Sequence, residues 1–406
     1  MKYIIILMDG VADYRIDELG GKTPLEYAES PSLNKIARKS EMGLVRTVPD
    51  GMAPGSDVAN LSVMGYDPRK YYTGRSSIEA VNLGISLSED DISFRCNLVT
   101  LSDDKNYADR VMVDYSAGEI TSGEARKLIE HVGNNLGTGE IFFYAGVSYR
   151  NIIIWKGGNG GNKLTPPHDI IGRKITDFLP EGPAADVLLG MMQRSAGILE
   201  GHIINRKRIS RGMNPANSIW VWGEGKRPSL DSFYDKYKLK GSIISAVDLI
   251  NGIGILAGLK PVKVRGATGT IDTNFKGKAN AAIKELGSDR DFVYLHIEAT
   301  DECGHQGNYA CKVKAIETID RQVIGPIVKA MDRRGSGYRI MILPDHYTPI
   351  SKRTHTSEPV PFMIYDSTRE PGSNQEGFSE YSAKKTGVYF DSGYELADYF
   401  FCKPKS

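Results

Sequence analysis

The sequence predicts an α/β protein with a doubly wound, mostly parallel sheet and a smaller inserted α+β domain. Buried-strand patterns recur near both ends of the 406-residue chain, and a long amphipathic helix pattern separates two of them. The middle of the chain instead carries hairpin-like strands and glycine-rich turns. Strand–helix–strand order is typical of a parallel sheet covered by its crossover helices.

The composition excludes several classes of protein. Lys and Arg number 51 and Asp and Glu 50, so there is no broad basic surface for nucleic acid or an anionic membrane. A small basic pocket remains compatible with this balance. Four scattered cysteines (Cys96, Cys303, Cys311, Cys402) without a CxxC pair predict neither a disulfide framework nor a thiolate zinc site. Neither a signal peptide nor a membrane span is recognisable, so we expect a cytoplasmic protein.

The first strand is expected over residues 3–8 and runs directly into Asp9 and Gly10. An apolar run that ends on an acidic residue and a glycine places a carboxylate at the carboxyl end of a central strand. Open α/β sheets bind their ligands at that edge. A helix is expected after Pro31 and a second strand over residues 44–48.

A turn at residues 54–57 precedes a helix predicted over residues 58–64. Ser56 lies in this turn, where its hydroxyl could approach a metal and act as a nucleophile. The alternative is that Ser56 is merely the N-cap of the helix. Ser62 falls in the middle of the helix, and we expect no catalytic role for it.

The last third of the chain resumes the alternation of strands and helices. Strands are expected over residues 292–297, 339–343 and 361–365, with a helix over residues 312–331 between the first two. Their order predicts that the first two strands lie parallel in the same sheet as residues 3–8.

The inserted domain is predicted over residues 93–217, so that residues 1–92 and 218–406 form the catalytic domain. Its hairpin-like strands, over residues 141–144 and 151–155, are expected to be joined by the glycine-rich turn at residues 157–161. The sheet of the first domain is expected to resume near residues 218–222.

Six metal-ligating side chains are predicted to arrive at one edge of the main sheet: Asp9, Asp301, His305, Asp345, His346 and His355. A single Asp or His at a strand end is usually a cap or a surface group, but six that converge indicate a metal site. Carboxylates mixed with imidazoles suit Mn²⁺, Zn²⁺ or Fe and are too rich in nitrogen for Mg²⁺ or Ca²⁺. Six ligands exceed the needs of one ion, which favours two ions roughly 3.5–4 Å apart.

Candidate substrate-binding residues lie in the inserted domain: Arg150, His168, Asp169, Arg206, Arg208 and Arg211. Arginines at these positions could clamp phosphate and carboxylate oxygens in a bidentate manner. The alternative for the run around Arg206 is a solvated charged face. His168 could act as a general acid or base or simply satisfy its loop.

These residues together resemble a known family. The motifs that carry the likeness are Asp9-Gly10, Gly55-Ser56-Asp57, Gly65-Tyr66-Asp67-Pro68, Asp301 to His305, Asp345-His346 and His355-Thr356. In this order they resemble the alkaline phosphatase superfamily, and within it the archaeal-type cofactor-independent phosphoglycerate mutases. The likeness covers nearly the whole chain.

The resemblance implies how the ligands are divided. Asp301, His305 and His355 would hold one metal ion. Asp9, Ser56, Asp345 and His346 would hold the other, with Ser56 becoming phosphoserine. Two divalent transition metal ions, Mn²⁺ before Zn²⁺, are expected, and no 2,3-bisphosphoglycerate. Glycerate, held by the inserted domain, would reorient and take the phosphoryl group back on its other hydroxyl.

Two departures from the family pattern bear on the substrate. Such mutases commonly carry histidine where this chain has Asn60, and often read Asp-Pro-His where it has Pro166-Pro167-His168. Both positions are expected to lie near the substrate. The alternative functions are therefore a homoserine kinase-like phosphotransferase of the same family, a metal-dependent phosphatase, or an inactive protein that retains the fold.

Overall fold

Two sheets organise the chain, one in each of two units. The computed structural model describes residues 1–369 and 376–402. Unit 1 comprises Met1–Tyr72 and Ser229–Ser406, and unit 2 comprises Thr73–Pro228. The predicted boundaries at 93 and 217 were therefore too narrow, by about 20 residues at the start of the insert and about ten at its end.

Unit 1 contains an eight-stranded sheet with the order β13-β2-β12-β11-β1-β10-β8-β9. The strands are β1 (Lys2–Met8), β2 (Ser40–Val45), β8 (Gly241–Ile244), β9 (Lys260–Pro261), β10 (Phe292–Ile297), β11 (Tyr338–Leu343), β12 (Val360–Asp366) and β13 (Tyr389–Phe390). Strand β1 pairs in parallel with both β10 and β11, and β12 runs antiparallel to β11. The predicted mostly parallel sheet is confirmed, and the carboxyl ends of its three central strands share one edge.

Strand β2 begins four residues earlier than the strand predicted over residues 44–48, and it ends three residues earlier. Gly43 makes this segment a weak strand by sequence, but the backbone just before β13 approaches so closely that it requires a glycine there. A Cβ on Gly43 would lie 2.6 Å from the Val388 carbonyl oxygen. After Val45 the chain leaves the sheet toward Pro49, which cannot donate to a strand ladder.

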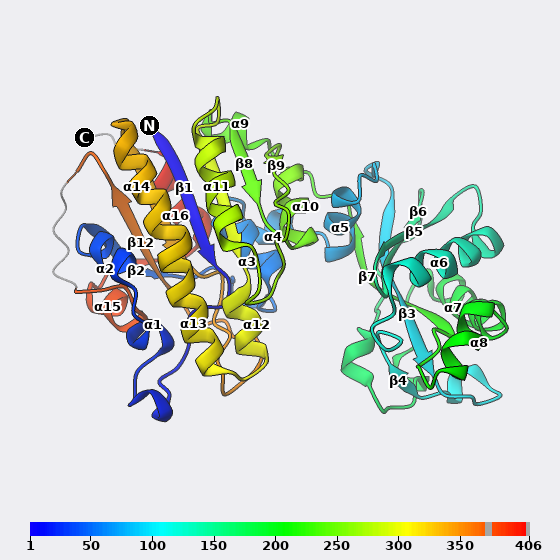
Figure 1. Ribbon diagram of the computed structural model, residues 1–406. Helices are drawn as coiled ribbons and strands as arrows, with labels where there is room; N and C mark the ends of the chain where they lie inside the picture. Colours follow the sequence, from blue (N-terminus) through cyan, green and yellow to red (C-terminus); the bar gives the residue numbers. More distant parts are fainter. Residues whose placement is uncertain (370–375, 403–406) are drawn as a thin grey trace. The chain divides into compact units, whose positions relative to one another are not determined.

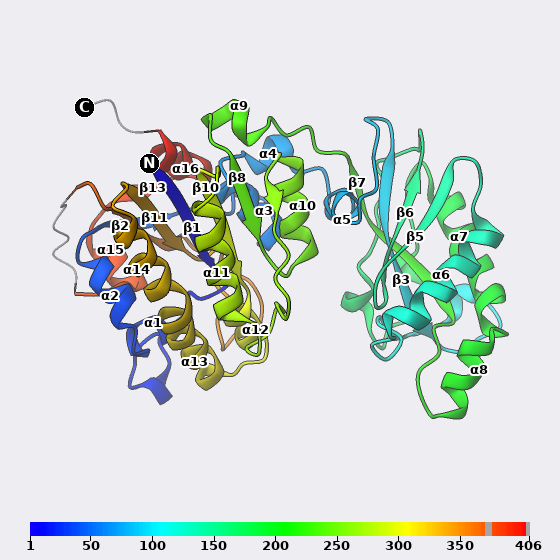
Figure 2. The ribbon, with the colours of Figure 1, turned by 45° about the horizontal axis from the view of Figure 1, so that its top comes forward.

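Helices cover both faces of this sheet (Figures 1 and 2). They are α1 (Pro24–Tyr27), α2 (Pro31–Ala37), α3 (Ser56–Val63), α4 (Pro68–Tyr71), α9 (Phe233–Tyr237), α10 (Asp248–Leu256), α11 (Phe275–Leu286), α12 (Ala299–His305), α13 (Tyr309–Ile319), α14 (Gly325–Arg334), α15 (Glu380–Lys385) and α16 (Gly393–Phe401). Figure 1 shows α11, α13 and α14 lying across one face, in front of β1.

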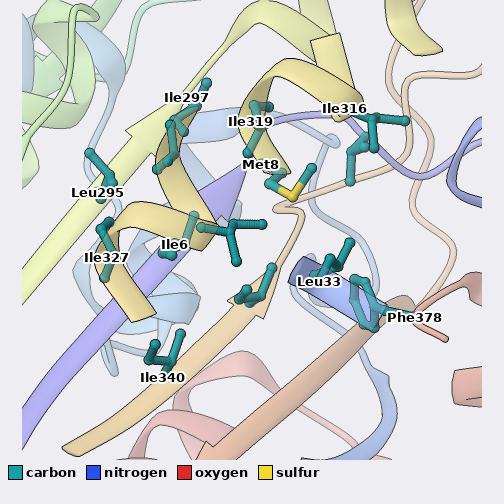
Figure 3. Packing of buried hydrophobic residues seen from close by; sticks show 14 of the residues in the cluster. Ile6, Met8, Leu33, Leu295, Ile297, Ile316, Ile319, Ile327, Ile340 and Phe378 are labelled. Atoms are coloured by element: carbon teal, nitrogen blue, oxygen red, sulfur yellow. The ribbon is translucent and has the colours of Figure 1, made fainter. Parts of the chain in front are cut away.

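The main core lies between these helices and the sheet. Alternate residues of β1, among them Ile4, Ile6 and Met8, point into it and are fully buried. Figure 3 shows Ile319 of α13 near Met8 at the end of β1, and Leu33 of α2 beside Phe378. This packing makes the central strands a rigid base for the side chains at their carboxyl ends.

The helix predicted over residues 312–331 is divided in two. Helix α13 ends at Ile319, a wider π-helical turn spans Asp320–Ile324, and α14 begins at Gly325. Pro326 has no N–H to donate and its ring crowds the preceding turn, which favours a break at this point. The Asp320 carboxylate at the break accepts hydrogen bonds from the Ser32 and Leu33 N–H groups of α2.

Unit 2 contains a five-stranded antiparallel sheet flanked by helices. Its strands are β3 (Ile92–Leu101), β4 (Met112–Asp114), β5 (Ile141–Val147), β6 (Arg150–Trp155) and β7 (Ser218–Lys226). Its α-helices are α5 (Arg75–Asn82), α6 (Ser122–Leu136), α7 (Ala185–Glu200) and α8 (Ile203–Ser210). A separate hydrophobic core lies between this sheet and α6 and α7.

Two predictions about the insert are wrong. Strand β7 pairs with β3 in unit 2, so residues 218–222 close the inserted sheet and do not resume the main one. Strands β5 and β6 are joined by a connection of only two residues. Val147 and Arg150, on either side of it, pair with each other. The glycine-rich segment 157–161 follows β6. A two-residue connection matches the twist of an antiparallel pair better than a long glycine run.

The structure also contradicts the expectation about cysteines. Cys303 in α12 and Cys311 in α13 form a disulfide, with Cα atoms 5.7 Å apart. Consecutive helices that meet at a sharp corner bring residues eight apart within bridging distance. Cys96 is a buried free thiol and Cys402 an exposed one. Among the described residues, no helix is long and apolar enough to cross a membrane.

Candidate two-metal site

The predicted ligands of unit 1 meet where three neighbouring strands end. Asp9 directly follows β1, and α12, which contains Asp301 and His305, begins two residues after β10. Asp345 and His346 follow β11, and His355 lies in the loop before β12. Because β10, β1 and β11 are parallel neighbours, residues from three distant parts of the sequence reach the same place.

Asp301, His305 and His355 form the first ligand group. The Nε2 atoms of His305 and His355 lie 2.9 Å apart. Asp301 Oδ2 lies 3.3 Å from His305 Nε2, and Asp301 Oδ1 lies 3.4 Å from His355 Nε2. Each histidine thus faces a different oxygen of Asp301. Single donor atoms of Asp301, His355 and His346 all lie within 4.8 Å of one another, so His346 adjoins this group as well.

Asp9, Asp345 and His346 form the second ligand group, with Ser56 beside it. His346 Nε2 lies 3.7 Å from Asp9 Oδ1 and 3.4 Å from Asp345 Oδ2. The Ser56 hydroxyl oxygen lies 3.2 Å from the same nitrogen. Atoms of Asp9, Asp345 and His346 all lie within 4.8 Å of one another.

Gly10 permits the two groups to approach. Its φ of +57° lies in the left-handed region, and a Cβ there would stand 2.5 Å from Asp301 Oδ1 and overlap the Thr348 hydroxyl. The Thr348 hydroxyl donates a 2.5 Å hydrogen bond to Asp301 Oδ1. A side chain at position 10 would therefore displace a ligand.

The electrostatics of the site fit divalent cations. Burial, followed by the charges of Asp345 and Asp301, raises the pKa of Asp9 well above its ordinary value. Among the described residues, Asp9 Oδ1 is buried without a hydrogen-bond partner. A buried, unpaired carboxylate oxygen beside two other carboxylates is stabilised by a bound cation.

The histidines differ in ways that suit ligation. Burial lowers the pKa of His346, which keeps its imidazole neutral and ready to donate a lone pair. Burial also raises the pKa of Asp301, but contacts with His305 and His355 outweigh it and hold that pKa well below its ordinary value. Donor chemistry, separation and electrostatics all fit two transition metal ions.

Ser56 is the first residue of α3, and Gly55 occupies the N-cap position. The alternative, in which Ser56 is only the N-cap of this helix, is therefore wrong. Its hydroxyl faces His346, at the N-terminal end of a helix where backbone N–H groups favour an anion.

Asn60 lies one turn further along α3 and is fully buried. Its amide nitrogen donates to Asp345 Oδ2 at 2.9 Å and to the Ser56 carbonyl at 2.8 Å, and the Tyr294 hydroxyl donates to its amide oxygen at 2.5 Å. Asn60, where the family commonly has histidine, thus contacts the proposed metal ligand Asp345. Both polar atoms of the Asn60 side chain already have hydrogen-bond partners.

Sequence reasoning missed several buried polar residues behind the ligands: Ser245, Lys278, His296, Glu298, Lys312 and Thr348. Glu298 and Asp9 outweigh the effect of burial and raise the pKa of His296 to about 10, which makes it a cation. Contacts with His296 and Lys278 likewise outweigh burial and lower the pKa of Glu298 to about 2. A histidine inside the apolar run 292–297 was the available signal.

The predicted residues of unit 2 divide into two sets. His168 packs edge-on against the rings of Tyr115 and Trp222, and its Nε2 lies 3.6 Å from Asp169 Oδ1. Arg95, which the sequence did not single out, lies over Trp222 at 4.3 Å and pairs with Glu79. Arg150 is exposed and lies over Tyr149, whose ring in turn contacts Tyr115.

Arg208 does not belong to this cluster. It is 1% exposed, pairs with Glu124 at 2.7 Å, and donates to the carbonyls of Ala117 and Asn214. All parts of its guanidinium are used within unit 2, which contradicts the predicted phosphate clamp at this position. Arg206 and Arg211 are exposed on and after α8, as a solvated face would be.

Comparisons with known proteins agree with this geometry. The family model described as 2,3-bisphosphoglycerate-independent phosphoglycerate mutase matches residues 37–205. The protein of that name from Methanothrix thermoacetophila is 49% identical over 396 residues, which cover 98% of both chains. The solved structure of the PH0037 protein from Pyrococcus horikoshii is 28% identical, with a TM-score of 0.83 over 100% of this chain and 98% of its own.

A second solved structure carries a functional name. The cofactor-independent phosphoglycerate mutase from Thermoplasma acidophilum is 27% identical, with a TM-score of 0.67 over 98% of this chain and 99% of its own. Because this likeness extends over nearly the full length of both chains, the chain belongs to the 2,3-bisphosphoglycerate-independent phosphoglycerate mutase family.

Proposed function

We propose that the protein interconverts 3-phosphoglycerate and 2-phosphoglycerate through a phosphoserine at Ser56, without 2,3-bisphosphoglycerate. The Ser56 hydroxyl, 3.2 Å from His346 at the edge of two adjoining ligand groups, is the observation that carries the proposal. Relatives of the same name, 47–49% identical over nearly the whole chain, support the substrate.

The two ligand groups would hold two divalent transition metal ions, Mn²⁺ before Zn²⁺. Asp301, His305 and His355 would ligate one, and Asp9, Ser56, Asp345 and His346 the other. When bound, such ions neutralise charge on the phosphoryl oxygens and favour the ionised serine hydroxyl.

The chemistry of the chain itself then consists of two displacements at phosphorus. The Ser56 oxygen forms a bond to phosphorus as the bond to the first glycerate oxygen breaks, and the leaving oxygen becomes a hydroxyl by taking up a proton that balances the one Ser56 gives up. The other hydroxyl of glycerate then attacks the phosphoserine, and the Ser56 hydroxyl is regenerated. Atoms balance, because donor and acceptor belong to one molecule and water takes no part.

Arg150, His168 and Asp169, together with Arg95, would bind the anionic glycerate in unit 2. Rings of Tyr115, Tyr149 and Trp222 surround these polar groups and hold them in place. Arg206 and Arg211 stay predictions. We further propose that the protein works in the cytoplasm on this small substrate, with neither nucleic acid nor membrane as a partner.

Phosphorus NMR tests the proposal on the Mn²⁺-supplemented protein, with a matched pair of serine variants. Ser56→Ala should lower the conversion of 3-phosphoglycerate by about 10³-fold or more. Ser62→Ala, on the same helix and with its hydroxyl unpartnered among the described residues, should leave it unchanged.

Two results would contradict the proposal. Release of inorganic phosphate at the rate of turnover would identify a phosphatase. Inertness toward 3-phosphoglycerate, with O-phosphohomoserine formed from homoserine and ATP, would identify a different acceptor.

A further inference from the structure

The two carboxylate oxygens of Asp9 have different neighbours. Oδ1 faces the second ligand group and lies 3.7 Å from His346 Nε2. Oδ2 faces the interior of unit 1 and lies 3.0 Å from His296 Nε2. His296 belongs to β10, the strand that pairs with β1 and places His296 opposite Leu7, two residues before Asp9.

Buried groups on the far side of the ring fix His296. Its Nδ1 lies 3.2 Å from Glu298 Oε1 and 3.1 Å from the Ser245 hydroxyl. The other oxygen of Glu298 accepts a hydrogen bond from Lys278 Nζ at 2.9 Å, and the same ammonium donates to the His296 carbonyl at 3.1 Å. Both ring nitrogens of His296 therefore have a carboxylate neighbour.

Four ionisable side chains thus form a buried row: Lys278, Glu298, His296 and Asp9. Lys278 and His296 are fully buried, and Asp9 and Glu298 are 3% and 5% exposed. Buried ion pairs are a weak source of stability, because desolvation of the charges offsets most of their attraction. The row ends on a proposed metal ligand, where partners that orient a ligand change metal affinity 10- to 100-fold in other proteins.

Packing alone accounts less well for this arrangement. If this row of buried charges served only to stabilise the core, it would not need to end on an atom of a metal ligand. Here the row ends on Asp9 Oδ2, and it leaves Oδ1 without a hydrogen-bond partner among the described residues. His296 Nε2 makes no aligned hydrogen bond among the described residues, so its 3.0 Å contact with Asp9 Oδ2 is an ion pair. That contact favours the orientation in which the other oxygen of Asp9 is directed at the second ligand group.

We propose that His296 is a positioning residue for Asp9, held in place by Glu298 and Lys278. The proposal rests on the two-metal function above and deepens it. Among the described residues, the ion pairs and hydrogen bonds of His296 reach Asp9 of the second ligand group and no member of the first. Loss of His296 should therefore weaken one of the two sites and spare the other.

A matched pair of amide variants tests this. In His296→Gln the amide nitrogen can take the place of Nε2 and reach Asp9. In His296→Asn it can take only the place of Nδ1, where Glu298 and Ser245 satisfy it. Both variants keep a polar group of similar size and leave the pair of Lys278 with Glu298 intact.

Mn²⁺ binding, followed by electron paramagnetic resonance with the metal alone, is the readout. His296→Asn should bind one equivalent with the wild-type affinity and the second at least about tenfold more weakly. His296→Gln should stay within about threefold of the wild type at both sites. Thermal melts without metal show whether each variant is folded, and His355→Ala, which should weaken the other equivalent, identifies the site affected.

The outcomes are distinct. Equal affinities in the wild type, Asn and Gln proteins would overturn the proposal, as would equal weakening of both sites or equal losses in the Asn and Gln variants. If His296→Asn fails to fold, second-site binding by His296→Gln below one tenth of the wild-type affinity would also overturn it. A wild-type protein that binds fewer than two equivalents would instead refute the two-metal function.

Discussion

The imidazoles of His346 and His355 stack with ring centroids 3.8 Å apart, although each belongs to a different ligand group. Asp301 also lies within ligating distance of both rings. The two groups are thus neighbours that share a wall of stacked histidines. A phosphoryl group bound there would meet both at once, as in enzymes that use a pair of metal ions for in-line displacement.

Removal of metal should abolish activity reversibly. A chelator should reduce turnover to background and lower the melting temperature, because ions that bind only the folded state stabilise it by mass action. Adding Mn²⁺ should restore both properties in a coupled assay and a thermal melt. Mg²⁺ should restore little, since half of the predicted side-chain ligands, Ser56 apart, are imidazoles. Full activity in the metal-free protein would contradict the site.

Gly10→Ala should damage the site beyond the cost of backbone strain. The new methyl group would crowd Asp301 and Thr348, so we expect at least one Mn²⁺ equivalent to be lost and activity to fall about 100-fold. Gly20 offers a matched control. It also has a left-handed φ, +67°, but a Cβ there would meet no described atom within 4 Å.

Gly20→Ala should therefore cost about 1 kcal/mol of strain and leave metal content unchanged. Metal analysis and thermal melts of both variants separate the two effects. Equal metal content in the two proteins would show that position 10 tolerates a side chain.

Glu380 should make the folded state less stable as the pH rises. Burial raises the pKa of its carboxyl from 4.5 to about 7, with Thr23 and the Asp13 N–H as hydrogen-bond donors and Lys312 the nearby cation. The folded state thus holds more protons than the unfolded state between these values. The stabilisation that the protonated Glu380 carboxyl contributes is therefore complete below pH 4.5 and is lost as the pH rises through 7.

Glu380→Gln removes that dependence. Its amide oxygen can accept from the Asp13 N–H, and its amide nitrogen can donate to the Thr23 hydroxyl oxygen. Relative to the wild type, the variant should gain up to about 3 kcal/mol in the free energy of unfolding between pH 4.5 and pH 8. Urea titrations at both pH values measure the difference. Glu376→Gln, at an exposed position, serves as the control. A parallel pH profile in wild type and Glu380→Gln would contradict the shift.

Arg208 and Arg206 should behave oppositely although they lie two residues apart on α8. Arg208→Ala removes the ion pair with Glu124 and the donors to the Ala117 and Asn214 carbonyls, and should destabilise unit 2 by about 1–3 kcal/mol. Arg206→Ala, at an exposed position, should change stability by less than about 0.5 kcal/mol. Chemical denaturation of both variants measures the loss in the free energy of unfolding. Comparable losses in the two variants would show that Arg208 does not stabilise unit 2 more than an exposed arginine.

Sequence reasoning predicted that the three candidate carboxylate ligands lie together, because each of them follows an apolar strand. Asp9, Asp301 and Asp345 interrupt or follow runs of buried residues, and the shared edge of parallel strands then brings them together. The position of each carboxylate at a strand end is visible in the local sequence, and the parallel order of the strands brings these ends together.

The residues that were missed give a weaker signal in the sequence. His296 lies inside an apolar strand, where a histidine is usually a satisfied core residue. Lys278 lies on an amphipathic helix, where a lysine is usually solvated, and only the tertiary structure shows that it is buried against Glu298. The apolar pattern of β7 likewise does not say which sheet it joins, and this displaced the predicted end of the insert.

The most direct measurement is mass spectrometry of the Mn²⁺-loaded protein, quenched in acid within milliseconds of mixing with one equivalent of 3-phosphoglycerate. We expect one phosphoryl group on the peptide that contains Ser56, no modification of Ser62, and no label after chelation of the metal. An active protein whose phosphoryl group appears on another residue, or is released as inorganic phosphate without reaching Ser56, would contradict the central claim.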